Sequence, residues 1–167
     1  VLDKAVEEEL PPLKLDGATV SNAITDLPTE QLGPLGTQQV RFEASTNKGM
    51  KSGPIDRIAS GGELARFLLA LKVSLEGDEA PRTLIFDEVD SGVGGAVAAA
   101  VGERLARLGK STQALGVTHS PPVAATGDNH MKNAKTATHS GAISGTDSLD
   151  TDARPAQIAR PPGGEDS

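Results

Sequence analysis

IASGGELAR, residues 58–66, joins a loop to a helix, and the rest of the chain is organised around it. Apolar residues after the glycines recur at spacings of three and four, which predicts a helix that runs to about Glu76 and faces a core. That apolar stripe consists of Leu64, Phe67, Leu68, Leu71 and Leu75. Ser60, followed three residues later by Glu63, is a capping box that satisfies backbone N–H groups of the first turn.

The two glycines of this stretch are not explained by helix capping alone. Gly61 and Gly62 fall in the first turn, where each glycine costs up to about 1 kcal/mol relative to alanine. A position without a Cβ atom lets a ligand approach the backbone, and a helix N-terminus with free N–H groups favours a phosphate. Phosphate binding and simple capping both remain open from this stretch by itself.

A second motif lies some twenty residues further on. Residues 83–86, TLIF, form a short apolar run typical of a buried strand, and the run ends in Asp87 and Glu88. Ligands of open α/β sheets bind at the carboxyl edge of the strands. An apolar strand that ends in an acid is the Walker B arrangement, in which Asp87 serves magnesium and the second acid can orient water.

A third motif follows another predicted strand, residues 113–118. This strand delivers His119 directly before Ser120 and two prolines, which prevent the strand from continuing. A lone histidine at a strand end is more often structural than functional. Here, however, the three motifs are predicted to line up on one edge.

These motifs resemble the C-terminal half of an ABC-type ATPase head. The sequences of three segments resemble those of the RecN family of bacterial DNA-repair proteins, which are related to the SMC ATPases. These segments are IASGGELARFLLALKV, TLIFDEVDSGVGG and VTHSPPVAA. The resemblance runs from about Val1 to Thr126. It implies an α/β fold, namely the C-terminal lobe of an ABC-type P-loop NTPase head with a short coiled-coil remnant and a disordered C-terminal tail.

The resemblance also implies a function, ATP hydrolysis in recombinational repair of DNA double-strand breaks, with ATP and Mg as cofactors. In this interpretation Asp87 positions magnesium, Glu88 polarises the attacking water, and His119 contacts the γ-phosphate. The nucleotide-binding positions are Ser60, Gly61, Gly62, Glu63, Ser91 and Gly92. The serine and glycines of the SGGE turn cap the γ-phosphate of ATP held by a second head, so that ATP is shared across a homodimer.

The chain lacks a Walker A motif. Residues 45–52 end in Lys-Ser, but Walker A needs glycine directly before the lysine and again five residues earlier, where this chain has Met50 and Ser45. In the family that motif lies in the N-terminal lobe. The resemblance therefore implies the Walker A lobe of the same protein as a partner, and it predicts that this chain alone is inactive.

Composition sets further limits. The 167 residues carry a net charge of −7 and have no Trp, Tyr or Cys. The acidic balance argues against this chain alone wrapping DNA, so contact with DNA is expected through the full-length assembly. The absence of cysteine excludes disulfides and fits a reducing cytoplasm, and the resemblance implies a cytoplasmic, nucleoid-associated protein. No membrane contact is expected. A start at Val1 without an initiator methionine predicts a fragment.

Three regions are predicted. The resemblance implies that residues 1–12 form the end of a coiled-coil arm, although the sequence alone slightly favours a surface helix. Residues 13–136 form the C-terminal lobe of the ATPase head, with strands expected at 19–24 and 40–44. Residues 137–167 are rich in Gly, Ser, Thr, Asp and Pro and are predicted to be disordered.

The loop 89–95 occupies the place of the ABC D-loop. Its usual aspartate falls on Gly94, and Asp90 is a candidate substitute. Two alternatives to the ATPase interpretation stay open. The chain could be a non-catalytic head fragment that acts only as an interaction module, or it could come from a head of another ABC/SMC subfamily.

Overall fold

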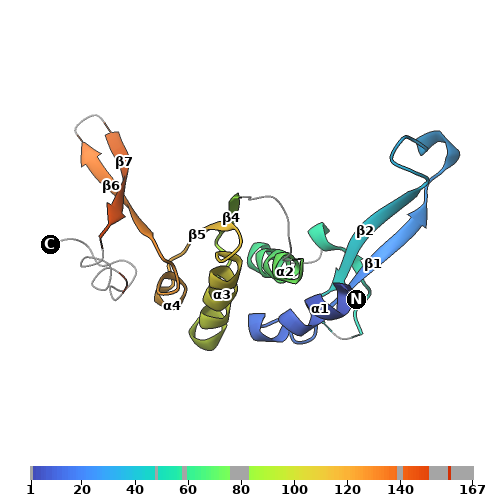
Figure 1. The fold of residues 1–167 in the computed structure, drawn as a ribbon, viewed down its shortest axis with the longest axis horizontal. Coiled ribbons are helices and arrows are strands. Elements are labelled where there is room, and N and C mark those ends of the chain that lie inside the picture. The colour runs from blue at the N-terminus through green and yellow to red at the C-terminus, as the bar shows by residue number, and fades with distance from the viewer. Residues whose placement is uncertain are drawn as a thin grey trace.

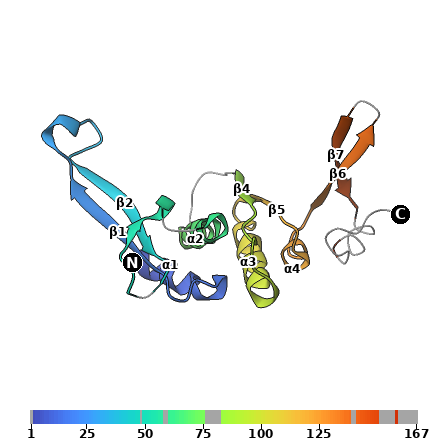
Figure 2. The same ribbon diagram turned by 180° about the vertical axis from the view of Figure 1, so that it is seen from behind.

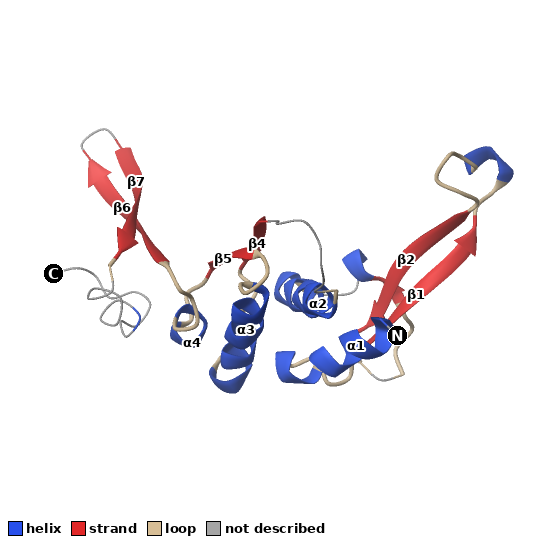
Figure 3. Cartoon of the chain, viewed as in Figure 1, coloured by secondary structure: helices blue, strands red, loops and turns tan. Residues whose placement is uncertain are grey.

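The computed structural model describes residues 2–47, 49–57, 60–75, 83–138 and 141–150, and Ile158. Two hairpins flank a group of helices and a small parallel sheet (Figures 1 and 2). Figure 3 distinguishes the helices from the strands. In chain order the elements are α1 (Leu2–Glu9), η1 (Pro11–Leu13), β1 (Thr19–Asp26), η2 (Thr29–Gln31), β2 (Gln38–Ser45), β3 (Gly53–Pro54), η3 (Ile55–Arg57), α2 (Gly61–Ser74), β4 (Thr83–Asp87), α3 (Gly95–Leu108), β5 (Gln113–Val117), α4 (Pro121–Ala124), β6 (His130–Thr138) and β7 (Gly141–Leu149).

The predicted strands of the first hairpin are confirmed and are slightly longer than expected. β1 and β2 pair antiparallel, with Val20 opposite Ala44, and β3 extends this sheet. Val20 and Ala44 are buried at the base of the hairpin, whereas Ile24 and Val40 are exposed nearer its tip. The base of the hairpin thus joins the core and its tip projects away from it (Figure 1).

Helix α2 begins at Gly61, as the capping box predicts, and is described as far as its C-cap residue Leu75. The predicted apolar stripe is only partly correct. Phe67 and Leu71 are buried, but Leu68 is 41% exposed and Leu75 is 48% exposed. Because α2 packs against both α1 and α3, its buried face is broader and turned toward Leu69, Ala70 and Val73.

The strands β4 and β5 are parallel, with Asp87 opposite Val117. They carry the second and third motifs, as predicted. The prediction of a buried strand is wrong for one face of this pair, since Ile85 is 72% exposed and Val117 is 47% exposed. Helix α3 covers the opposite face, where Phe86 is buried and Leu105 approaches Gly116. Within the described part of the chain, this small sheet has a cover on one side only.

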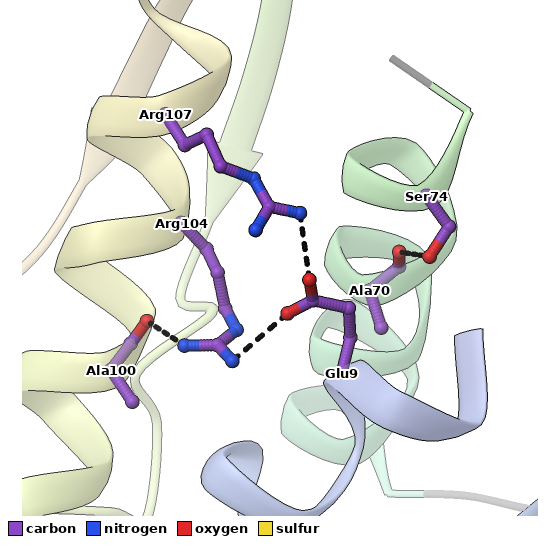
Figure 4. Close-up of polar contacts among 6 residues, drawn as sticks. All are labelled: Glu9, Ala70, Ser74, Ala100, Arg104 and Arg107. Carbon is purple, nitrogen blue, oxygen red and sulfur yellow. Dashed lines mark hydrogen bonds and ion pairs between the residues drawn. The ribbon is translucent and has the colours of Figure 1, made fainter. Parts of the chain in front are cut away.

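The first helix is anchored to α3 through a single carboxylate (Figure 4). Glu9 forms ion pairs with Arg104 at 2.9 Å and with Arg107 at 2.7 Å, and Arg104 also donates a hydrogen bond to the Ala100 carbonyl. The side chains of Glu9 and Arg104 are 15% and 13% exposed. The predicted helix at the N-terminus is confirmed, and its continuation as a coiled-coil arm stays a prediction.

Replacing Glu9 with alanine is expected to lower the free energy of unfolding by about 2 kcal/mol, because Arg104 is then left nearly buried without its counter-charge. Urea denaturation of the 167-residue chain measures this difference. Glu8→Ala is the matched control, since Glu8 lies on the same helix and is exposed. A loss of less than about 0.5 kcal/mol for Glu9→Ala, the size expected for an ordinary surface change, contradicts the anchoring role.

Part of the predicted disordered tail is folded. β6 and β7 pair antiparallel from His130 opposite Leu149 to Thr138 opposite Gly141. The prediction of disorder from residue 137 onward is therefore wrong for the described residues up to 150. Paired backbone N–H and C=O groups satisfy one another without large apolar side chains, so composition was a poor guide here. The rest of that predicted tail lies outside the described residues, apart from Ile158.

Candidate functional site

The start of α2 has the predicted capping box. The Glu63 N–H donates to the Ser60 hydroxyl at 3.4 Å, and the Ser60 N–H donates to the Glu63 carboxylate at 3.0 Å. The Ser60 hydroxyl also donates to the same carboxylate oxygen at 3.1 Å. Residues 58 and 59 of the opening motif lie outside the described residues. Capping is thus confirmed as one role of Ser60 and Glu63.

The two glycines differ in what surrounds them. A Cβ atom at Gly61 would meet nothing within 4 Å. A Cβ atom at Gly62 would lie 3.0 Å from the Ser91 carbonyl oxygen and 3.2 Å from the Arg66 guanidinium. Gly62 therefore has a packing role that sequence analysis missed, because the loop after β4 crosses directly over it. Gly61 has no such packing requirement.

Arg66 connects α2 to that loop. Its guanidinium donates a hydrogen bond to the Ser91 carbonyl at 3.2 Å, and the residue is only 5% exposed. Burial lowers the pKa of Arg66, while the nearby Glu63 carboxylate acts in the opposite direction. Arginine keeps its charge in proteins despite such a shift. Arg66 thus holds the loop with a charged donor, a contact that the sequence motif did not indicate.

Two exposed carboxylates lie at the end of β4. Asp87 is the last residue of the strand, and both Asp87 and Glu88 are exposed. Glu88 has a φ of +52°, in the left-handed region that non-glycine residues rarely occupy. Its carbonyl accepts a hydrogen bond from the Ser91 N–H at 2.9 Å, which closes a tight turn. Backbone strain of this kind costs about 1–3 kcal/mol and is concentrated at functional sites.

The predicted site residues come together. A cavity of about 450 Å³ is lined by residues from α2, the end of β4 and the loop that follows. Seven of the nine predicted positions line it, namely Ser60, Gly61, Gly62, Asp87, Glu88, Ser91 and Gly92. His119 lines a neighbouring cavity of about 350 Å³ that shares Glu88, Ser91 and Gly92 with the first. Of the predicted set, only Glu63 lines neither cavity, because its carboxylate caps α2.

Magnesium fits this cavity only if groups other than the protein side chains complete its coordination shell. Within the described part of the chain, no group of three or more His, Asp or Glu side chains could hold a metal ion. Mg²⁺ commonly binds through one or two carboxylates together with water and substrate phosphates, so such a cluster is not required. The exposed Asp87 carboxylate at the cavity wall fits that mode.

No protein-family model matches the chain. Among solved structures, the Smc head domain with a coiled coil and joint from Pyrococcus yayanosii has a TM-score of 0.62 at 21% identity, and the match covers 94% of this chain and 28% of that chain. A structure from work on ATP-driven dimerization and DNA-stimulated activation of SMC ATPases has a TM-score of 0.53 at 21% identity, and covers 94% of this chain and 88% of that chain. The fold is therefore that of part of an SMC head domain.

The similar curated proteins are DNA repair proteins named RecN. RecN of Rickettsia bellii is 44% identical over 135 residues, which cover 81% of this chain and 24% of that protein. RecN of Streptomyces coelicolor is 40% identical over 166 residues, which cover 93% of this chain and 29% of that protein. The chain resembles the C-terminal part of RecN, and it spans about a quarter of the length of these relatives.

The similarity to RecN is longer than the sequence motifs suggested. An end near Thr126 was predicted, but a match that covers 93% of the chain must extend past that residue. The segment that follows contains no nucleotide-binding motif and few large apolar side chains, which is why it gave no recognisable signal. Within the described residues, no helix is long and apolar enough to span a lipid bilayer.

Proposed function

We propose that this chain is the C-terminal lobe of an SMC-like ATPase head, and that the whole protein hydrolyses ATP in recombinational repair of DNA double-strand breaks. The observation that carries the proposal is the meeting of three separate sequence motifs at two adjoining cavities. The RecN relatives and the SMC head structures support the same function. A role of this kind places the protein in the cytoplasm, at the nucleoid.

The residues have distinct proposed roles in hydrolysis. Glu88 accepts a hydrogen bond from a water molecule and directs its oxygen toward the γ-phosphorus, whose bond to the β–γ bridging oxygen then breaks. His119 donates to a γ-phosphate oxygen from the neighbouring cavity. Asp87 holds magnesium, which offsets the negative charge of the phosphates when it is bound. These roles fit the exposure of all three side chains.

The missing Walker A lobe has a suitable surface to bind. Parallel strands are normally covered on both faces, but β4 and β5 expose Ile85, Leu115 and Val117 on one face. In the register of the pair, Ile85 lies opposite Leu115, so these side chains share that face. We propose that the N-terminal lobe of the same protein covers it and supplies the groups that hold the β- and γ-phosphates.

We further propose that Ser60, Gly61 and Gly62 contact the γ-phosphate of ATP held by a second head. Helix α2 has 14 residues, and its first two residues, Gly61 and Gly62, line a cavity that Asp87 and Glu88 also line, which suits a phosphate accompanied by magnesium. Two such heads then bind ATP between them as a homodimer. The matched SMC work concerns ATP-driven dimerization, which supports this arrangement.

Replacing Gly61 with alanine separates phosphate contact from helix capping. Alanine is the better helix former and meets no atom within 4 Å, so thermal stability is expected to be unchanged or higher. In a longer protein that carries both lobes, the added methyl group is expected to abolish ATP-dependent head pairing and turnover. Sedimentation with and without ATP and a phosphate-release assay measure these effects.

Gly33→Ala is the matched control, since its methyl group also enters open space and Gly33 lies in the connection between β1 and β2, outside the residues that line the cavity. If Gly61→Ala pairs and hydrolyses ATP at the rate of the parent protein, the phosphate role is wrong and only the helix cap remains. If both variants lose pairing, the loss does not come from the cavity.

A further inference from the structure

We propose that Asp90 is a positioning residue that acts through the Thr118 hydroxyl to hold the turn carrying His119. The proposal rests on the proposed function, because it assumes that His119 faces the nucleotide. Asp90 was a candidate substitute for the D-loop aspartate. In the structure its carboxylate accepts a hydrogen bond from Thr118 of the same chain.

The burial of Asp90 shows that this contact matters. Asp90 is 9% exposed, and its neighbour Val89 is 1% exposed, so the start of the loop is drawn into the protein. A buried carboxylate is costly unless hydrogen bonds compensate for the lost water. The Thr118 hydroxyl supplies such a bond across 28 residues of sequence. The loop after β4 is thereby joined to the end of β5.

The direction of the hydrogen bonds at Thr118 is determined. The Ser120 N–H donates to the Thr118 hydroxyl oxygen at 2.9 Å. A hydroxyl has one proton, and a carboxylate only accepts, so that proton must point to Asp90. The two bonds therefore run in series from the Ser120 backbone to Thr118 and on to Asp90.

His119 lies between the two residues that these bonds hold. The side chain of Thr118 is fixed on one side, and the backbone of Ser120 is fixed on the other. The His119 ring itself is exposed and lines the same cavity as Asp90 and Glu88. β5 ends at Val117 and α4 begins at Pro121. The Ser120 carbonyl accepts the first helical hydrogen bond of α4, from the Ala124 N–H at 2.9 Å, while the Ser120 N–H is held by the Thr118 hydroxyl. We infer that the Asp90–Thr118 contact sets the direction in which His119 enters the cavity.

The first test uses the 167-residue chain and does not depend on ATP hydrolysis. Thr118→Val keeps the shape of the side chain but removes both hydrogen bonds, so the Ser120 amide hydrogen is expected to exchange about five- to tenfold faster by NMR. Thr118→Ser is expected to restore slow exchange. Asp90→Ala should also speed exchange, whereas Asp90→Asn retains an acceptor oxygen and should not. Equal exchange in all variants overturns the proposal.

The second test is a double-mutant cycle in a longer protein with both lobes. Thr118→Val is expected to lower kcat about tenfold with KM unchanged, because His119 is misdirected rather than removed. In a His119→Ala background the same change should have no further effect on kcat. Thr112→Val is the matched control, since Thr112 directly precedes the first residue of β5, at the end opposite to Thr118. If the loss of kcat in the double variant equals the product of the losses in Thr118→Val and His119→Ala, the positioning role is overturned.

The two tests distinguish the inference from the proposed function. If His119→Ala leaves kcat unchanged, the proposed role of His119 in hydrolysis is wrong. The exchange measurement then decides on its own whether Asp90 holds the turn. If His119→Ala lowers kcat and Thr118→Val does not, the proposed function stands and the positioning role of Asp90 is wrong.

Discussion

Replacing Glu88 with glutamine is expected to lower kcat for ATP hydrolysis by about 10²- to 10⁴-fold in a longer protein that carries both lobes. The amide keeps the shape of the side chain but removes the charge that orients the attacking water. Binding of ATP is expected to persist, and paired heads should accumulate because hydrolysis no longer separates them. Single-turnover phosphate release and sedimentation with ATP measure both effects.

The left-handed backbone of Glu88 allows a second prediction at the same position, in which stability and hydrolysis change in opposite directions. Glycine adopts a φ of +52° without a steric penalty, so Glu88→Gly is expected to raise the free energy of unfolding by up to about 1 kcal/mol while also abolishing hydrolysis. Glu103→Gln, an exposed position on α3, is the control for loss of one negative charge. Hydrolysis by Glu88→Gln at the parent rate excludes Glu88 as the residue that activates water.

The 167-residue chain on its own is expected to hydrolyse no ATP detectably and to bind ATP more weakly than micromolar. The reason is the missing Walker A motif, whose backbone N–H groups and lysine hold the β- and γ-phosphates in P-loop ATPases. Calorimetry of the chain with ATP and magnesium measures the affinity. Addition of the N-terminal lobe as a separate polypeptide is expected to restore turnover.

The exposed face of β4 and β5 supplies the control for that reconstitution. Ile85→Thr places a polar group on this face and is expected to weaken capture of the N-terminal lobe, whereas Thr83→Ser, at the start of the same strand, should not. Micromolar ATP affinity of the chain alone contradicts the prediction, because the cavity would then hold nucleotide without the second lobe. Tight capture of the lobe without turnover favours the alternative of a non-catalytic interaction module.

Local signals in the sequence were sufficient for the elements that carry the motifs. The capping box predicted the first residue of α2, and the apolar runs predicted β4 and β5, because these features depend on neighbours in the chain. The meeting of the motifs at one edge followed from the parallel arrangement of those strands. That is why most predicted site residues line the same pair of cavities.

The features that could not be predicted depend on contacts between distant segments. The approach of Ser91 to Gly62 and the bond from Thr118 to Asp90 join residues more than 25 positions apart. Exposure of Leu68 depends on where α1 and α3 pack, which a periodic pattern on α2 does not specify. The β6–β7 hairpin is held by backbone pairing, which side-chain composition predicts poorly.

The ion pairs of Glu9 give the first helix a mechanical connection to the cavity. The Glu9 carboxylate pairs with Arg104 and Arg107, which lie three residues apart on the same face of α3. Two ion pairs rather than one therefore oppose movement of α1 relative to α3. Helix α3 starts at Gly95, directly after the loop that contributes Ser91 and Gly92 to the cavity wall. The Glu9 ion pairs therefore tie α1 to the helix that directly follows the loop of the cavity wall.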